Sequence, residues 1–147
     1  NGKYIVTASN IDITIVTETE EKIEKHYAII WDKETQKQVG NIMRHNQWIY
    51  SAQFSPSGKY IVTRTNNNMA HIWSTETNTK IGETIPHDDK ITSIQFSPNE
   101  KYIVSASEDG IIKIPEVYSS QEFINKYRKL FQDWPLTEEE LIEYNFK

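Results

Sequence analysis

Histidine, serine and carboxylate side chains are the groups with which this sequence could do acid–base, nucleophilic or metal chemistry. Its four histidines, His26, His45, His71 and His87, are scattered and lack the paired spacing that a metal site needs. No serine nucleophile motif or glycine-rich phosphate loop occurs, and the lack of cysteine excludes thiolate chemistry. The acidic run 138–140 fits a helix N-terminus better than a metal site. We therefore expect no enzymatic activity, no cofactor and no metal.

Charge and hydropathy narrow the possibilities further. The chain has 16 Lys+Arg and 21 Asp+Glu, a formal net charge of −5, which disfavours binding to a nucleic-acid backbone. No apolar run approaches the ~20 residues of a membrane span, and the first residues do not form a basic and apolar leader. We expect a cytoplasmic protein that binds neither nucleic acid nor membrane.

An internal repeat supplies the elements that must position any functional side chain. The segment Gly2–Thr7 recurs unchanged as Gly58–Thr63 and again, slightly changed, as Glu100–Ser105. The second and third copies lie 42 residues apart, and other landmarks, such as His45 with His87, keep the same step. The first interval is 14 residues longer, so one unit carries an insertion.

Each repeat unit has the pattern of four short strands. In the complete unit they are expected at 49–54, 60–65, 69–73 and 80–85, separated by turns rich in Pro, Gly, Asn and Thr. No convincing helical period occurs before Tyr118. The sequence therefore predicts an all-β repeat.

These residues resemble the WD-repeat β-propeller family over positions 1 to about 117. The resemblance is carried by Ile30-Trp31-Asp32, by a His before each first strand, by Phe-Ser-Pro-x-x-Lys-Tyr-Ile-Val, and by Ser107-Glu108-Asp109-Gly110. It implies a partial propeller of about three four-stranded antiparallel blades, of which the first is incomplete. The units are expected at about 1–40, 41–82 and 83–117.

The remaining residues, 118–147, are expected to form a short helical extension. Capping-box spacings begin at Ser119 and Thr137, and an apolar face at helical spacing follows the first of them. The ending Leu136-Thr137-Glu138-Glu139 with Tyr144 resembles the end of many bacterial WD-repeat proteins. We expect the extension to cover the edge or underside of the last blade.

The resemblance also implies a buried hydrogen-bond chain in each blade. It runs from a His before the first strand to an Asp in a turn, a Ser or Thr on the second strand, and a Trp on the third. The matching residues are His45, Thr65, Asn67 and Trp73 in the second unit, and His87, Ser107 and Asp109 in the third. Asn67 predicts a weaker chain than Asp109, because a charged hydrogen bond contributes ~1.5–3 kcal/mol. Pro115 replaces the third Trp, so that strand should end there or lie at an edge.

The insertion predicts a projecting hairpin. Residues 11–17 alternate apolar and polar, an acidic turn follows, and 23–30 leads back to Trp31. The charged tip, with Glu18, Glu20 and Glu21, fits either a solvated hairpin or an acidic contact element.

For function, the resemblance implies a non-catalytic scaffold that binds other proteins or peptides through loops of one face. The candidate binding residues are Asn46, Gln47, Trp48, Asn66, Asp88, Asp89, Lys90 and Glu108. Trp48 is the strongest of them, because aromatic residues are enriched among binding hot spots; the alternative is packing against a neighbouring blade.

The length of 147 residues holds only about three units, whereas closed propellers have ~4–8 blades. We therefore expect the C-terminal fragment of a longer propeller, closed by the remaining blades of the parent chain or by self-association. The alternative is the sensor or regulatory propeller of a larger bacterial signalling protein, with an enzymatic or NTPase module upstream.

Overall fold

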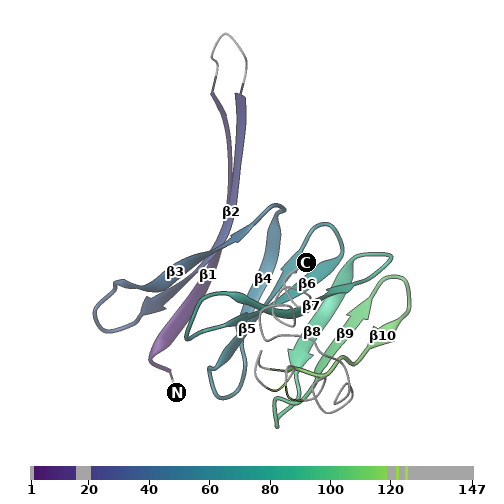
Figure 1. The fold of residues 1–147 in the computed structure, drawn as a ribbon. Coiled ribbons are helices and arrows are strands. Elements are labelled where there is room, and N and C mark those ends of the chain that lie inside the picture. The colour runs from purple at the N-terminus through teal and green to yellow at the C-terminus, as the bar shows by residue number, and fades with distance from the viewer. Residues whose placement is uncertain (1, 16–20, 119–121, 123–124, 126–147) are drawn as a thin grey trace, which may run out of the picture.

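The computed structural model describes residues 2–15, 21–118, 122 and 125, and its strands form three antiparallel sheets that stand side by side in chain order (Figure 1). The first sheet contains β1 (Tyr4–Ile15), β2 (Glu21–Asp32) and β3 (Gln38–His45). The middle sheet contains β4 (Ile49–Phe54), β5 (Tyr60–Thr65), β6 (Met69–Ser74) and β7 (Lys80–Pro86). The last sheet contains β8 (Ile91–Phe96), β9 (Ile103–Ser107) and β10 (Ile112–Lys113). The predicted all-β partial propeller is confirmed, and its sheets do not close into a ring.

The chain passes from the first sheet to the middle sheet between residues 45 and 49, and from the middle sheet to the last sheet between residues 86 and 91. The unit boundaries expected near residues 40 and 82 therefore lie inside β3 and β7. The helical extension expected at 118–147 lies outside the described residues, apart from Tyr118, Glu122 and Asn125. Within the described ranges, no helix is long and apolar enough to cross a membrane.

The core consists of two hydrophobic clusters, one on each face of the middle sheet. Ile61 belongs to the cluster shared with the first sheet, and its neighbour Val62 to the cluster shared with the last sheet. Successive side chains of a strand point to opposite faces, so both residues are buried only because both faces are covered. Burying one such side chain stabilises the fold by about 1.5–3 kcal/mol.

The repeat extends to the backbone conformation. Residues with positive φ recur at the same step of 42, as Gln36 with Asn78, Gly40 with Gly82, Gly58 with Glu100, and Asn68 with Gly110. Turn geometry is therefore kept where the residue type changes. Glu100, for example, adopts a φ of 58° where the preceding unit has glycine, and its carboxylate accepts a 2.7 Å hydrogen bond from Ser57 Oγ.

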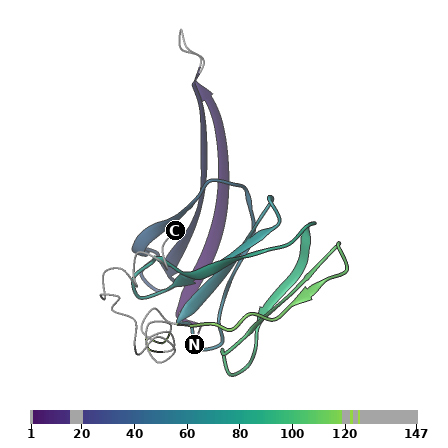
Figure 2. The same cartoon turned by 45° about the vertical axis from the view of Figure 1, so that its right-hand side comes forward.

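The insertion forms the predicted hairpin. β1 and β2 pair continuously from Tyr4↔Asp32 to Ile15↔Glu21, whereas β3 pairs with β2 only as far as His26. The part beyond is a two-stranded ribbon that projects from the sheets in both views (Figure 1 and Figure 2). Its tip, residues 16–20, lies outside the described residues, and the acidic contact role stays a prediction.

Pro115 has the effect expected of a proline in a ladder. β10 is the edge strand of the last sheet and ends at Lys113, and pairing resumes at a bridge between Tyr102 and Glu116. Ile103 N donates to Pro115 O at 3.0 Å, but proline has no amide with which to return the bond. Among the described residues no fourth strand pairs with β10.

Candidate functional site

The eight predicted binding residues lie at one end of the middle and last sheets, in the loops before β4 and β8 and in the β5–β6 and β9–β10 turns. All eight are exposed. Asn66 N donates to Trp48 O at 2.9 Å, and Glu108 N donates to Lys90 O at 3.0 Å. Each loop between sheets is thus fastened to the hairpin turn that follows it. We call residues 46–48, 66, 88–90 and 108 the loop rim.

The two halves of the loop rim are also joined to each other. Asn68 Nδ2 donates to Asp88 O at 3.3 Å, and His87 N donates to Asn68 O at 2.9 Å. These bonds connect the β5–β6 turn of the middle sheet to the loop that leads into the last sheet. The backbone of the rim is therefore held largely by hydrogen bonds to its amide and carbonyl groups, with contributions from the side chains of Asn68 and Asp89.

Trp48 combines the two alternatives expected of it. Its side chain is 43% exposed, and its ring centroid lies 6.1 Å from that of His26 on β2 of the first sheet. One part of the indole packs against the neighbouring sheet, and the other faces solvent, where a partner could contact it.

Tyr50, on β4 beside the loop rim, is a candidate binding residue that the sequence did not indicate. It is 49% exposed, and its ring lies 5.8 Å from Arg64 Cζ and 5.9 Å from Lys90 Nζ. Cation–π contacts at exposed sites contribute about 0.5–1 kcal/mol each. Tyr50 lies at a register shift between Ile49 and Ser51 in the pairing of β4 with β5, so alternation along the strand gave no clear signal for it. Tyr50 links the middle sheet to Lys90 before the last sheet.

In the last sheet, a polar cluster forms around His87. His87 Nδ1 lies 3.3 Å from Asp109 Oδ2, and His87 Nε2 lies 2.8 Å from Ser105 Oγ. Burial opposes ionisation of Asp109, but hydrogen bonds from the amides of Ile111 and Asp88 prevail and lower its pKa. Because Ser105 has no exposed surface, this Ser-His-Asp arrangement cannot reach a substrate and ties the sheet together.

The Ser or Thr that takes part in the hydrogen-bond chain lies two residues earlier on the strand than expected. Trp73 Nε1 donates to Thr63 Oγ1 at 3.0 Å, and Ser105 is the repeat equivalent of Thr63. The residues that we expected, Thr65 and Ser107, form hydrogen bonds with residues of the adjoining turn or loop instead. Thr65 donates to Asn67 Oδ1 at 2.6 Å, and Ser107 donates to Asp89 O at 2.7 Å. Both positions face the same side of the strand, so alternation alone could not separate them.

In the middle sheet the hydrogen-bond chain does not include the expected histidine, His45. His45 packs edge-on against His71 and tilted against Trp73, with ring centroids 5.2 and 4.9 Å apart. Its Nε2 is buried and has no hydrogen-bond partner among the described residues. Burial, then the positive charges of His71 and Lys80, lower the pKa of His45 to about 3. Burial and Lys80 lower that of His71 to about 4.

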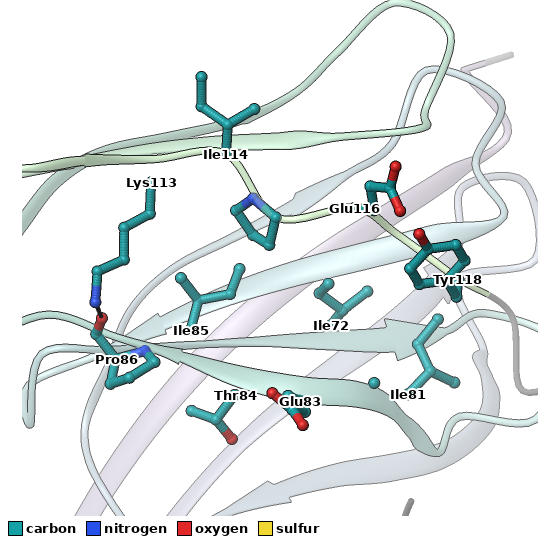
Figure 3. Close-up of a pocket in the computed structure, with 12 residues that line it drawn as sticks. Ile72, Ile81, Glu83, Thr84, Ile85, Pro86, Lys113, Ile114, Glu116 and Tyr118 are labelled. Atoms are coloured by element: carbon teal, nitrogen blue, oxygen red, sulfur yellow. Dashed lines mark hydrogen bonds between the residues drawn. The ribbon is translucent and has the colours of Figure 1, made fainter. Parts of the chain in front are cut away.

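A groove of about 490 Å³ lies between β7 and the segment from Lys113 to Tyr118. Figure 3 shows the side chains of Ile72, Ile81 and Ile85 along β6 and β7, beneath that segment. The groove adjoins the open edge of the last sheet, where Ile112 is 64% exposed.

As for metals, no group of three or more His, Asp or Glu side chains in the described part of the chain could hold an ion. The arrangement offers a rigid, partly aromatic rim and an open sheet edge, both of which suit binding.

Comparison with known proteins gives one family and one fold. The family described as "WD domain, G-beta repeat" matches residues 36–74 and 78–114, which together make up more than half of the chain. No curated protein matches the sequence. Among solved structures, the computationally designed Ika4 protein is similar with a TM-score of 0.55 and 19% identity, and the match covers 65% of this chain and 61% of that one. At this identity the likeness concerns the fold alone.

Proposed function

The chain belongs to the WD40-repeat family, and from this premise we propose that it is a non-catalytic scaffold that binds other proteins or peptides through its loop rim. WD40 repeats generally mediate protein–protein interaction. The observation that carries the proposal is the pair of exposed aromatic side chains, Trp48 on a loop whose backbone is hydrogen-bonded to the β5–β6 turn and Tyr50 on the adjoining strand β4. A rim that is rigid before binding loses little entropy on association, and exposed aromatics supply contact area.

The proposal includes completion of the propeller. The described residues form three sheets, fewer than the ~4–8 blades of a closed propeller, and no strand among them pairs with the outer edge of β10, which adjoins the groove beside β7. We propose that further blades, from a longer parent chain or from a second copy, cover this edge. Light scattering on the 147-residue chain tests the second route: a monomer at micromolar concentration excludes closure by self-association and leaves the parent chain.

Affinity purification from the source cells, with the tagged chain as bait, tests the rim. Trp48→Ala and Tyr50→Ala should each lose partners that the unchanged chain retains, by about tenfold or more in recovery, because hot-spot truncation removes 2 kcal/mol or more. Tyr102→Ala is the matched control, since Tyr102 is 38% exposed and precedes β9 at the opposite end of its sheet.

Thermal unfolding of each variant must first show that the fold is intact. Folded Trp48→Ala and Tyr50→Ala proteins that keep every partner would rule out the loop rim as the interaction surface. Loss of the same partners in Tyr102→Ala would place the interaction elsewhere on the sheets.

A further inference from the structure

A second pocket, of about 260 Å³, lies between the first and middle sheets, behind the loop that carries Trp48. Four of its lining residues are basic and come from three strands: Arg44 and His45 from β3, His71 from β6, and Lys80 from β7. The other lining residues are polar or aromatic, namely Asn46, Gln47, Thr65, Asn67 and Trp73. Among the residues that the structure describes, no carboxylate lines the pocket, although the chain as a whole carries a net charge of −5.

The repeat shows what this place holds in the next unit. There His87 lies 3.3 Å from the carboxylate of Asp109. One step of 42 residues earlier, the corresponding residues are His45 and Asn67. Asn67 is neutral, and its Oδ1 accepts a hydrogen bond from Thr65 at 2.6 Å. His45 therefore lacks the carboxylate that its repeat equivalent, His87, has beside it.

The bases in the pocket disfavour one another's protonation, and burial has removed part of their hydration. Burial lowers the pKa of His45, and so do the charges of three neighbouring basic side chains: His71, Lys80 and His26 of β2. Burial also lowers the pKa of Lys80, whose Nζ donates to Thr84 Oγ1 at 2.5 Å. Thr84 Oγ1 in turn lies 3.3 Å from His71 Nδ1. Each electrostatic effect between these groups arises from one basic side chain lowering the pKa of another. A bound anion would offset all of these effects.

The size of the pocket limits what fits. A water molecule takes about 30 Å³ of liquid volume, so 260 Å³ corresponds to roughly nine waters. That volume holds a carboxylate or a phosphate with a short stretch of what carries it, but it is smaller than the ~300–1,000 Å³ of drug-sized sites. Arg44, Asn46 and Gln47 stand exposed on its β3 side, which leaves the pocket accessible from solvent.

We propose that this pocket binds an oxyanion, a carboxylate or phosphoryl group, which lies against His45 as the Asp109 carboxylate lies against His87. Arg44 and Lys80 supply the fixed positive charges, and His45 and His71 supply ring nitrogens that donate once they are protonated. The proposal does not depend on the loop rim as a protein-binding surface, because it uses a different set of charges.

Histidine side-chain NMR on the full chain tests the proposal, with sulfate, phosphate and acetate as probes. Sulfate does not titrate near neutral pH, so any change in its affinity reports on the protein. Binding should shift the His45 and His71 resonances and leave His87 unchanged. Affinity for sulfate should rise as the pH falls from 7 to 5, because the anion raises the pKa of both histidines and binding then takes up protons. The phosphate and acetate arms decide between a phosphoryl and a carboxylate ligand.

Three variants make the test specific. Lys80→Gln should weaken sulfate binding by about tenfold or more, whereas Lys101→Gln, which changes a lysine outside the pocket, should not. Asn67→Asp keeps every base and supplies the acid within the chain. It should raise the pKa of His45 and weaken binding of added anions by a similar factor.

Unmoved His45 and His71 resonances at millimolar concentrations of all three anions would overturn the proposal. So would equal sulfate affinity in the unchanged chain and in a folded Asn67→Asp variant.

Discussion

The two junctions between sheets use the same apolar packing but opposite electrostatics. Between the middle and last sheets, a buried histidine is satisfied by a serine and an aspartate, His87 with Ser105 and Asp109. Between the first and middle sheets, the equivalent His45 lies among other bases, and its Nε2 has no partner among the described residues. The repeat thus conserves shape at both junctions and polar satisfaction at only one. The comparison teaches that the unsatisfied junction is the one available for a ligand.

The apolar packing at the two junctions predicts the largest effects of mutation on stability. Ile61 and Ile103 are repeat equivalents, both have no exposed surface, and each belongs to a different core cluster. Ile61→Ala and Ile103→Ala should each lower the free energy of unfolding by about 2–5 kcal/mol, from lost burial and the cavity left behind. Urea unfolding measures both.

Ile112→Ala is the control for that pair, because Ile112 is 64% exposed and its loss should change stability by no more than about 0.5 kcal/mol. If only one of the two buried variants is destabilised, the junctions do not share the same packing.

The titratable groups at the two junctions predict that the junctions lose stability at different pH values. In the folded chain the pKa of His45 is about 3 and that of His71 about 4, below their ordinary value of 6.5. The unfolded chain therefore binds protons first, and the stability from these neutral histidines is present above pH 6.5 and is lost as the pH falls below it. A loss of roughly 2 kcal/mol for each histidine is expected between pH 7 and pH 5.

The pKa of Asp109 is instead lowered below its ordinary 3.8, so its contribution persists until the pH falls through the folded-state value. Hydrogen exchange followed from pH 7 to pH 4 should show β3 and β6 losing protection before β8 and β9. Replacement of His71 by Gln should reduce that early loss. Simultaneous loss at both junctions would contradict the electrostatic difference.

A smaller effect separates two glycines at equivalent places. Gly40 and Gly82 both have positive φ, 69° and 64°, so alanine at either position costs about 1–2 kcal/mol in backbone strain. At Gly40 a Cβ would also collide with the buried side chain of Asn78, whereas at Gly82 it meets nothing within 4 Å. Gly40→Ala should therefore lower the melting temperature more than Gly82→Ala. Equal shifts would show that Asn78 moves aside freely.

Much of this molecule could be predicted from its sequence because the repeat is local. Strand and turn positions follow from alternation and from turn residues, and the projecting hairpin followed from a 14-residue excess in one unit. The eight candidate binding residues were chosen from the family resemblance, and the structure places them in loops and turns beside strand ends. Two strand positions were wrong: Thr63 and Ser105 hold the hydrogen-bond chain, not Thr65 and Ser107, because both choices lie on the same face of the strand.

The sequence by itself determined the sheets, their order and the end of each sheet at which the loops gather, since these depend on patterns of a few residues repeated every 42. Only the tertiary structure decided which side chains meet. Tyr50 meets Lys90 of the following loop, and His45 meets His71 and Lys80 across a sheet boundary. The physical reason is that burial and charge act through space, so the pKa of a histidine depends on residues that no local pattern brings near it.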